Sequence, residues 1–290
     1  MWSRLKNWAK IDLRLVPRVD SPLLIKEGAG SIDPSRPDIA VHRALRRYGS
    51  DILKVPVIPG SSLRGVFRQA YEQLLISAEC KICDISQNET SCMKGKEAGK
   101  DVEGIWSSSC EACRLFGSTA LKGRIEFQDA YPCETGVEEI ESCVILRSGV
   151  ALSRKTQSPL NGAKFQQEMV VRHPKDKVWF DTSITILNFR LLELSGLIRT
   201  LFDFGSGYAR LGHGTSRGNG AMALIEFPSI TIACRGKNLE DISKEVPPIP
   251  WDEEDKPISV PFLGMSGRKL SKKTHDLLLK NWREMVGNVG

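Results

Sequence analysis

The chain has 290 residues and 41% hydrophobic residues, with 41 lysines and arginines against 35 acidic residues, a net charge of +6. No apolar run approaches the length of a membrane span, and the N-terminal MWSRLKNWAK lacks the hydrophobic region of a signal peptide. We therefore expect a cytoplasmic protein without a membrane partner, long enough to bury a substantial core and basic enough to permit a polyanionic partner.

The N-terminal part combines a strand pattern with a long basic loop. Residues 8–16, WAKIDLRLV, alternate apolar and polar side chains and predict a half-buried strand. The Gly- and Pro-rich segment that follows holds Asp33 and Asp38 among several arginines, including Arg43. An aspartate in such a loop is a candidate for phosphodiester chemistry, as a metal ligand or in proton transfer. The alternative is turn chemistry, since Asp precedes Pro at Asp33 and Asp38 is able to cap the next segment.

The stretch 55–75, VPVIPGSSLRGVFRQAYEQLL, predicts a short strand followed by an amphipathic helix. Ser61 or Ser62 is expected to be its N-cap. Arg64 and Arg68 lie one turn apart near the helix start, where amides, hydroxyls and arginines together form a candidate phosphate site. The alternative is a capped amphipathic helix with two solvated arginines.

Five of the eight cysteines lie close together in the sequence, as the CxxC pairs Cys80/Cys83 and Cys110/Cys113 with Cys92 between them. Two CxxC pairs around a polar insert have the spacing of a tetrahedral structural zinc site. We expect Cys83, Cys92, Cys110 and Cys113 to be the ligands, with Cys80 as the substitute. The insert is too polar to fold alone, so the metal would stabilise it. Buried free thiols or a redox pair are the alternatives.

The second half of the chain reads as strands, a hairpin and a helix. Residues 123–131 predict a strand, and 144–180 predict a long two-stranded hairpin with its turn near 158–162. Its basic stem is typical of an arm that presses on a nucleic-acid backbone or a neighbouring subunit, and a solvated hairpin is the alternative. Residues 178–190 predict a strand, and 191–204 an amphipathic helix.

A glycine-rich loop at 212–220 leads into a last strand and can bring backbone amides close to phosphates around Ser216 and Arg217. It is no P-loop, because GK[ST] is missing, and no dinucleotide fingerprint, because it precedes a strand. A glycine-rich hairpin turn is the alternative. The charged segment from about 235 is expected to be a peripheral extension ending in a short basic helix.

With insertions removed, the order of these elements reduces to βαββαβ, the ferredoxin-like arrangement shared by many RNA-binding modules. We therefore expect an α+β fold with a ferredoxin-like (modified RRM) core over residues 1–234. This core would include the zinc-binding insertion at 80–113 and the hairpin at 144–180. Residues 235–290 would form a C-terminal extension.

Four motifs in this order make the chain resemble a RAMP-superfamily backbone subunit of a type III CRISPR effector complex, in its Csm-like, zinc-carrying branch. They are IPGSSLRG (58–65), CxxCRLFG (110–117), RSGVALSRKT (147–156) and GHGTSRGNG (212–220). The resemblance covers about residues 8–230. It implies a ferredoxin-like RAMP core stacked with paralogous subunits into a filament, with a guide RNA (crRNA) along it and small and large subunits as further partners.

The resemblance also implies roles for individual residues. In catalytic members a loop aspartate supports cleavage of the target RNA with Mg²⁺ or Mn²⁺, and family spacing places it at Asp38, with Asp33 in reserve. The hairpin acts as a thumb that kinks the guide–target duplex at regular intervals. The residues placed on RNA are Ser61, Ser62, Arg64, Arg68, Arg43, Arg147, Ser153, Arg154, Lys155, Ser216 and Arg217.

Three other functions stay open at this point. Some backbone subunits of this type lack cleavage activity and serve only as scaffolds that bind the guide and neighbouring subunits. A stand-alone guide-processing ribonuclease is disfavoured by the cysteine insert and by the lack of a well-placed catalytic histidine. A zinc-stabilised protein-interaction module would show no salt-dependent RNA binding.

Overall fold

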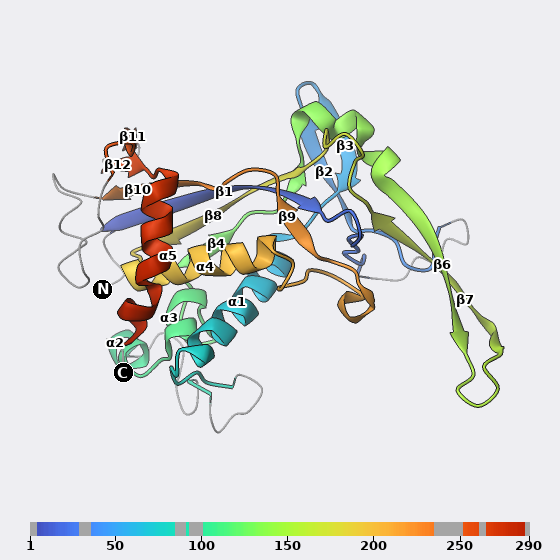
Figure 1. The fold of residues 1–290 in the computed structure, drawn as a ribbon, viewed down its shortest axis with the longest axis horizontal. Helices are drawn as coiled ribbons and strands as arrows, with labels where there is room; N and C mark the ends of the chain where they lie inside the picture. The colour runs from blue at the N-terminus through green and yellow to red at the C-terminus, as the bar shows by residue number, and fades with distance from the viewer. Residues whose placement is uncertain are drawn as a thin grey trace.

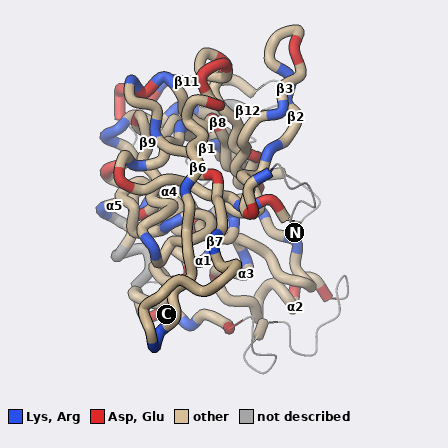
Figure 2. The backbone as a smooth tube through the Cα atoms, turned by 90° about the vertical axis from the view of Figure 1, so that its right-hand side faces the viewer, with Lys and Arg blue, Asp and Glu red and all other residues tan. Residues whose placement is uncertain are grey.

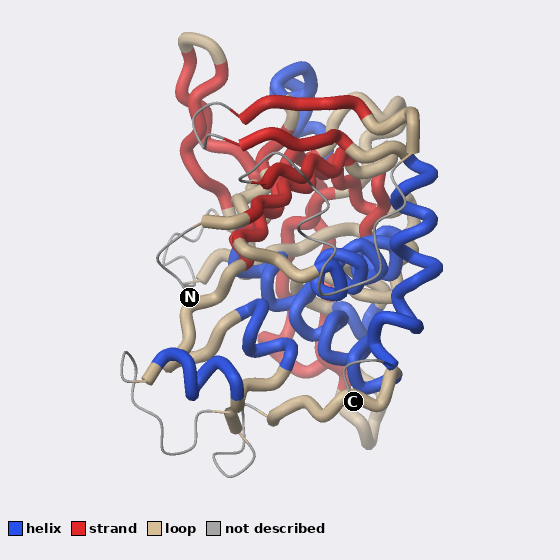
Figure 3. Tube along the Cα trace, turned by 90° about the vertical axis from the view of Figure 1, so that its left-hand side faces the viewer, coloured by secondary structure: helices blue, strands red, loops and turns tan. Residues whose placement is uncertain are grey.

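A computed structural model describes residues 5–28, 36–84, 91–92, 101–234, 252–260 and 265–287. The fold is α+β, as predicted, and is built on an eight-stranded antiparallel sheet with helices packed on one face (Figures 1 and 3). The strands of this sheet are β1 (Asn7–Pro17), β4 (Ile125–Phe127), β5 (Tyr131–Pro132), β8 (Phe180–Leu187), β9 (Met222–Leu224), β10 (Ser229–Cys234), β11 (Lys256–Val260) and β12 (Met265–Lys269).

The main path of the sheet is β11-β12-β10-β1-β8-β4, with β5 beside β8 and β9 beside the end of β1. Central β1 pairs with β8 from Trp8 to Leu15 and with β10 from Asn7 to Asp12. Its alternating sequence explains this position, because one set of side chains faces the helices while the other set stays polar and partly exposed. The predicted first strand is therefore confirmed.

Two long helices cover the apolar face, α1 (Gly60–Ser77) and α4 (Leu191–Gly205). In α1, Leu63, Phe67, Tyr71 and Leu75 recur every fourth residue and are all buried. The Phe67 ring lies 5.1 Å from that of Phe204 in α4, which joins the two helices over the sheet. Smaller helices are α2 (Val102–Ser107), α3 (Glu111–Phe116) and the 3₁₀ segments Glu134–Cys143 and Thr215–Arg217.

Two hairpins stand apart from the sheet, β2 (Arg43–Tyr48) with β3 (Asp51–Pro56), and β6 (Val144–Leu152) with β7 (Pro159–Val170). The second extends well away from the body (Figure 1). Its turn lies at 153–158, earlier than the predicted 158–162. The amide of Gln157, at φ +55°, bonds to the Ser153 carbonyl, and the Thr156 amide donates to the Ser153 hydroxyl. Local side-chain bonding at Ser153 thus closes the turn before the Asn-Gly pair is reached.

The C-terminal segment is not peripheral, which corrects our expectation. β12 pairs with β10 at the edge of the sheet, and α5 (Lys272–Gly287) packs against α4. Trp282 of α5 is 5% exposed, and its ring lies 6.4 Å from that of Tyr71. At Gly196 of α4 a Cβ would come within 2.5 Å of the Trp282 ring, so glycine is required for this contact. The described part of this segment therefore completes the core.

Replacing Trp282 by alanine is expected to destabilise the protein by about 3–5 kcal/mol, because it leaves a large cavity between α1, α4 and α5. Equilibrium denaturation in urea measures this change. The matched Trp282→Phe variant retains most of the ring contact and should lose clearly less. A loss below about 1 kcal/mol in the alanine variant would show that α5 does not contribute to the core.

Candidate metal centre and nucleic-acid interface

Four cysteines meet where the end of α1 approaches α3. The Sγ atoms of Cys83, Cys92, Cys110 and Cys113 all lie within 4.8 Å of one another. Cys83 Sγ lies 3.5 Å from Cys113 Sγ and 3.7 Å from Cys110 Sγ. Four thiolates about 2.3 Å from a central zinc would have sulfur–sulfur distances of about 3.8 Å, so the spacing fits such an ion. Cys80 lies outside this group. The four cysteines chosen as ligands from the sequence are thus the four that come together.

Hydrogen bonds favour negative charge on Cys110, whereas burial raises the pKa of Cys92 to about 11, and the hydrogen bond to Cys110 together with burial raises the pKa of Cys113. The backbone amide of Cys110 donates to Cys92 Sγ at 3.1 Å, and Arg68 Nη2 donates to Cys113 Sγ at 3.5 Å. The hydrogen bond from the Cys113 thiol is the main reason that the pKa of Cys110 falls to about 4. Thiolates are the form that binds metal, and donors of this kind support the charge of a four-thiolate site.

Arg64 and Arg68 of α1, both expected to contact RNA, bind the segment that holds Cys110 and Cys113. Arg68 Nη1 donates to the Gly117 carbonyl at 2.9 Å, and its Nε bonds to Glu72 at 2.8 Å. Arg64 donates to the Phe116 carbonyl and remains exposed. Arg68 is therefore fully occupied within the chain, whereas Arg64 keeps a solvent-facing guanidinium beside the helix start.

A buried ionic chain ties the same element to α4. Glu193 is completely buried, which by itself would raise its pKa, but Arg124 and Arg190 lower the pKa below its usual range. Arg190 also bonds to Glu111, the residue after Cys110. Since removing one partner would leave an uncompensated buried charge, these contacts fix the position of α3.

The start of α1 differs from our prediction. Pro59, rather than Ser61 or Ser62, occupies the N-cap position, and no side chain caps the helix from there. The amide of Gly60 donates instead to the Asp129 carboxylate at 2.7 Å. Asp129 is distant in the sequence, so local spacing could not reveal it. Ser61 remains exposed at the helix start and Ser62 partly exposed.

Backbone hydrogen bonds bring three predicted motifs side by side. The His213 amide in the glycine-rich loop donates to the Leu24 carbonyl at 2.7 Å. The His42 amide donates to the next carbonyl, that of Ile25, at 2.8 Å, and the Val57 amide donates to the His42 carbonyl at 3.0 Å. The glycine-rich loop, the aspartate loop and the strand leading into α1 therefore follow one another across a single surface.

Asp38 lies beside the middle of β7 in the β6–β7 hairpin and is exposed. Its Oδ2 accepts a hydrogen bond of 2.7 Å from the Gln166 amide of β7. The neighbouring Ile39 amide donates to the Gln166 carbonyl, and the Glu168 amide donates to the Ile39 carbonyl. The aspartate loop is thus paired along β7, which fixes Asp38 next to the hairpin. Asp33 lies outside the described residues.

Arg43 holds this loop in place. Its side chain is 15% exposed, and its Nη1 lies 2.7 Å from Glu168 Oε2, which also accepts from the Val41 amide at 3.0 Å. Glu141 is a second, more exposed partner at 3.3 Å. Burial would raise the pKa of Glu168, but the bonds from Arg43 and Val41 outweigh it and lower that pKa. Arg43 was expected to contact RNA. In the structure its bond to Glu168 holds the Asp38 loop in position.

The Glu168→Gln variant is expected to lose about 1–3 kcal/mol of stability at pH 7, because Arg43 loses the closer and more buried of its two charged partners. A carboxylate with a lowered pKa stabilises the fold above its unfolded pKa, near 4.5, and loses that effect as pH falls through its folded pKa. The difference from the unmodified protein should therefore shrink between pH 5 and pH 3 in urea denaturation. Glu141→Gln, at the exposed partner, is the control and should cost below about 1 kcal/mol. A difference independent of pH would contradict this assignment.

The glycine-rich loop is held tightly against residues 21–25. A Cβ at Gly212 would lie 2.3 Å from the Leu24 carbonyl oxygen, and Gly212 and Gly220 both have positive φ. Ser21, which the sequence did not single out, is 2% exposed and donates to the Gly218 carbonyl at 2.5 Å. Its oxygen accepts from the Ala221 amide, so one hydroxyl anchors the end of the loop.

Ser216 and Arg217 lie at the exposed tip of this loop. The Nη2 atom of Arg217 is 3.1 Å from the His213 ring nitrogen Nε2. Both side chains therefore face solvent on a backbone that is fixed from behind, which is the arrangement that phosphate contacts need.

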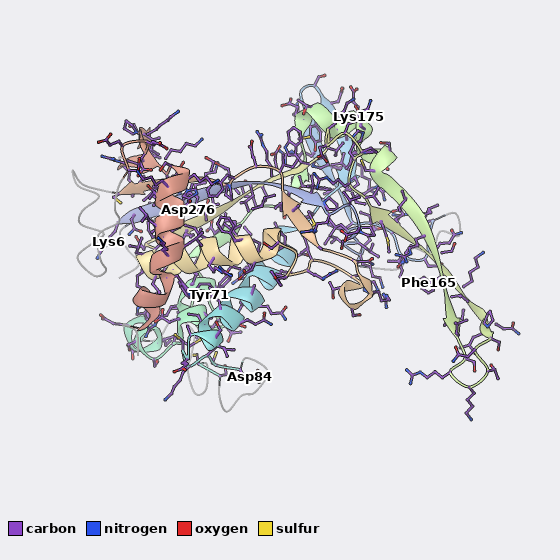
Figure 4. All side chains as sticks on the ribbon, in the orientation of Figure 1. Lys6, Tyr71, Asp84, Phe165, Lys175 and Asp276 are labelled. Atoms are coloured by element: carbon purple, nitrogen blue, oxygen red, sulfur yellow. The ribbon has the colours of Figure 1, made fainter. Side chains whose placement is uncertain are left out.

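The projecting hairpin is basic along its length. Its exposed cations are Arg147, Arg154, Lys155 and Lys164, and the sequence from 145 to 167 contains no aspartate or glutamate. Figure 2 faces this hairpin and shows the other charges interspersed over the body. Phe165 lies across Gly149, where a Cβ would come within 2.3 Å of the ring, and it stiffens the hairpin midway (Figure 4).

A cleft of about 370 Å³ opens on the sheet face opposite the helices. Its four basic residues are balanced by Asp12, Asp129, Asp181 and Glu226. Several of these charges pair with each other, as Arg14 does with Glu226 at 2.8 Å. A neutral, internally paired cleft offers little to a polyanion, so it does not compete with the surface described above.

A comparison with protein families finds a match for this chain. The family model of the RAMP superfamily matches residues 19–223, more than two thirds of the chain. No curated protein matches the sequence. No helix within the described ranges is long and apolar enough to cross a membrane.

Proposed function

The chain belongs to the RAMP superfamily, a family of CRISPR-associated RNA-binding modules, and we propose that it is a guide-RNA-binding backbone subunit of a type III effector complex. We assign it to the Csm-like branch, with guide and target RNA, paralogous backbone subunits, and small and large subunits as partners. The observation that carries this proposal is the backbone pairing of the glycine-rich loop, the Asp38 loop and the lead-in to α1.

The order of the strands and helices is compatible with a ferredoxin-like core and supports the proposal. β1, α1, β4, β8, α4 and β10 follow in chain order, and their strands lie in the order β10-β1-β8-β4. Both helices cover the same face (Figure 1). We read this order as a βαββαβ unit, with the cysteine-rich insertion (residues 80–113) after α1 and the thumb hairpin before β8.

The cofactor proposed for the cysteine cluster is a structural Zn²⁺. The thiolates of Cys83, Cys92, Cys110 and Cys113 would fill all four ligand positions, as in structural rather than catalytic zinc sites. The ion would join Cys83 and Cys92 to α3, and so to the arginines of α1. Its proposed role is to hold the start of α1 in position for RNA.

The proposed RNA path begins at the exposed start of α1, where Ser61, Ser62 and Arg64 face solvent. It continues over Ser216 and Arg217 of the glycine-rich loop. The thumb, through Arg147 and the tip residues Ser153, Arg154 and Lys155, would press on the guide–target duplex. These contacts go to the RNA backbone and would hold any guide sequence.

Asp38 is the residue we propose for target cleavage, with Mg²⁺ or Mn²⁺. RNA carries its own nucleophile, the 2′-hydroxyl, so cleavage chiefly requires in-line geometry at a distorted nucleotide. Mg²⁺ is commonly held by one or two carboxylates and substrate phosphates, a role that Asp38 fits since only Oδ2 is bonded to Gln166. The metal would supply charge stabilisation when bound. Asp38 would hold it where the thumb meets the loop.

A non-catalytic scaffold is the second candidate. Among the described residues, the only group of three or more metal-binding side chains is the cysteine cluster. A single carboxylate beside the thumb is also compatible with guide binding and subunit stacking alone. The Asp38 variants described in the Discussion separate the two functions.

Salt-dependent RNA binding tests the proposed surface. Arg217→Ala is expected to weaken binding of a single-stranded RNA and to lower the slope of log K against log salt by about 0.7, the value for one phosphate contact. Lys175→Ala is the control, because this exposed lysine lies at the opposite end of the hairpin from the thumb tip (Figure 4). Filter binding between 50 and 300 mM salt would measure both. An unchanged slope in Arg217→Ala would remove the glycine-rich loop from the RNA path.

A further inference from the structure

The two most exposed large apolar side chains among the described residues are Tyr208, at 85%, and Val19, at 82%. They are far apart in the sequence but close in the fold. The Arg18 side chain lies 3.4 Å from the position of a Cβ at Gly207, so residues 18–19 and 207–208 are neighbours. These two neighbouring segments at the end of α4 each carry one exposed apolar side chain and are together called the patch below.

Tyr208 is held by a helix end that normally buries such a residue. The Tyr208 amide donates to the Asp203 carbonyl, the Gly207 amide donates to the Phe204 carbonyl, and Gly207 has φ +81°. This is the Schellman arrangement, in which an apolar residue after the glycine commonly packs on the last helical turn. Here the backbone adopts that arrangement while the ring remains in solvent. The chain thus presents an aromatic ring on a fixed support.

Two exposed arginines lie near Tyr208, Arg18 through its bond to Ser206 and Arg210 two residues further along the chain. Arg18 Nη1 donates to the Ser206 carbonyl at 3.3 Å, and Arg210 Nη1 donates to the Asn219 carbonyl at 3.4 Å. These bonds fix each guanidinium through one nitrogen, and both arginines remain exposed. Two acidic residues are near: the Asp20 carboxylate lies 4.0 Å from Arg18 Nε and is highly exposed, and the Asp203 carboxylate pairs with Arg199 at 3.1 Å.

The patch is continuous with the glycine-rich loop. The Arg18 amide donates to the Ala221 carbonyl at 2.9 Å, and the Leu211 amide donates to the Gly220 carbonyl at 2.8 Å. Arg210 is bridged to Ala221 across the two arms of the loop. Tyr208 therefore lies next to the glycine-rich loop that carries Ser216 and Arg217.

We propose that Tyr208 stacks against an unpaired base of an RNA strand, while Arg18 and Arg210 contact the adjoining phosphates. Exposed aromatic rings beside cationic grooves bind single strands in this way, without regard to sequence. A ring and one valine form too small an apolar area for a stable protein interface, which favours RNA as the occupant. This inference rests on the proposed RNA-binding function, and it adds a base contact to a path otherwise made of phosphate contacts.

The test compares Tyr208→Ala and Tyr208→Phe with the unmodified chain, using a single-stranded RNA of mixed sequence. Tyr208→Ala is expected to weaken binding about 10-fold with an unchanged salt slope, because stacking involves no ion release. Tyr208→Phe should bind like the unmodified chain. Guide loading and target binding by the guide-loaded complex are measured separately. The step that Tyr208→Ala weakens identifies the strand that supplies the base.

Each alternative outcome is decisive. If the unmodified chain binds RNA and Tyr208→Ala binds equally well, the stacking proposal is overturned while the proposed function stands. A change in self-association with unchanged RNA affinity would assign the patch to a protein interface and also overturn it. If the unmodified chain does not bind RNA at all, both proposals fail.

Discussion

The Cys113→Ser variant should lose its zinc, with the metal content falling from one ion per chain to none. Cys113 is buried and contacts Cys83, Cys110 and Arg68, so its removal opens the cluster. Structural zinc contributes much of the stability of polar elements that cannot fold alone. We expect the melting temperature to fall by roughly 5–10 °C, equivalent to about 3 kcal/mol in a chain of this size. Metal analysis and thermal melting measure the two effects.

Cys80→Ser is the matched control, because Cys80 lies in the same CxxC pair as Cys83 but outside the cluster. It should keep one zinc per chain and an unchanged melting temperature. Loss of zinc in Cys80→Ser, together with its retention in Cys113→Ser, would overturn the ligand assignment. Zinc absent from the unmodified protein, purified without chelators, would overturn the metal centre itself.

The Asp38→Ala variant should lose target cleavage, by at least about 100-fold, while guide binding and assembly persist. The reason for expecting intact assembly is structural, since Asp38 is exposed and makes a single hydrogen bond to the Gln166 amide. Cleavage of a complementary RNA by the reconstituted complex, in Mg²⁺ or Mn²⁺ and in EDTA, measures the effect. The cleavage products are separated by size on a gel. The products cut at the positions of this subunit should be missing with Asp38→Ala.

Asp38→Asn separates charge from loop geometry. The amide oxygen can still accept from Gln166, so the loop stays paired along β7, but the carboxylate charge is lost. Equal loss of cleavage in Asp38→Asn and Asp38→Ala would assign the effect to that charge. Full cleavage in both variants would make the chain a scaffold, and Asp33→Ala would then test the reserve aspartate.

The elements that depend on local spacing along the chain were predicted correctly from the sequence. The first strand, α1, α4 and the long hairpin follow from alternation or helical periodicity, and the structure contains all of them. The choice of four cysteines out of five also agrees with the cluster. In each case the residues that carry the signal lie within one element or one insertion.

Predictions failed where a distant residue decides the local structure. The N-cap assigned to Ser61 or Ser62 is wrong, because Asp129 satisfies the Gly60 amide and removes the need for a hydroxyl. The C-terminal segment resembled a polar tail, yet β12 pairs with β10 and Trp282 reaches the core. Neither partner can be identified from spacing along the chain.

The same limit applies to charged residues near the site. From sequence alone, Arg43 and Arg68 resemble free cations in basic stretches. In the fold, Arg43 pairs with Glu168. Arg68 pairs with Glu72 and also donates to the Gly117 carbonyl. Conversely, Ser21 gave no signal, although its buried hydroxyl anchors the glycine-rich loop.

The most direct test of the account is to map where RNA touches this chain, by ultraviolet crosslinking of the guide-loaded complex and mass spectrometry of the crosslinked peptides. We predict crosslinks in three regions, at the start of α1 (60–64), the thumb (147–155) and the glycine-rich loop (212–220). Crosslinks confined to the neutral cleft on the opposite face of the sheet, around residues 10–14 and 226–229, would contradict the proposed RNA path.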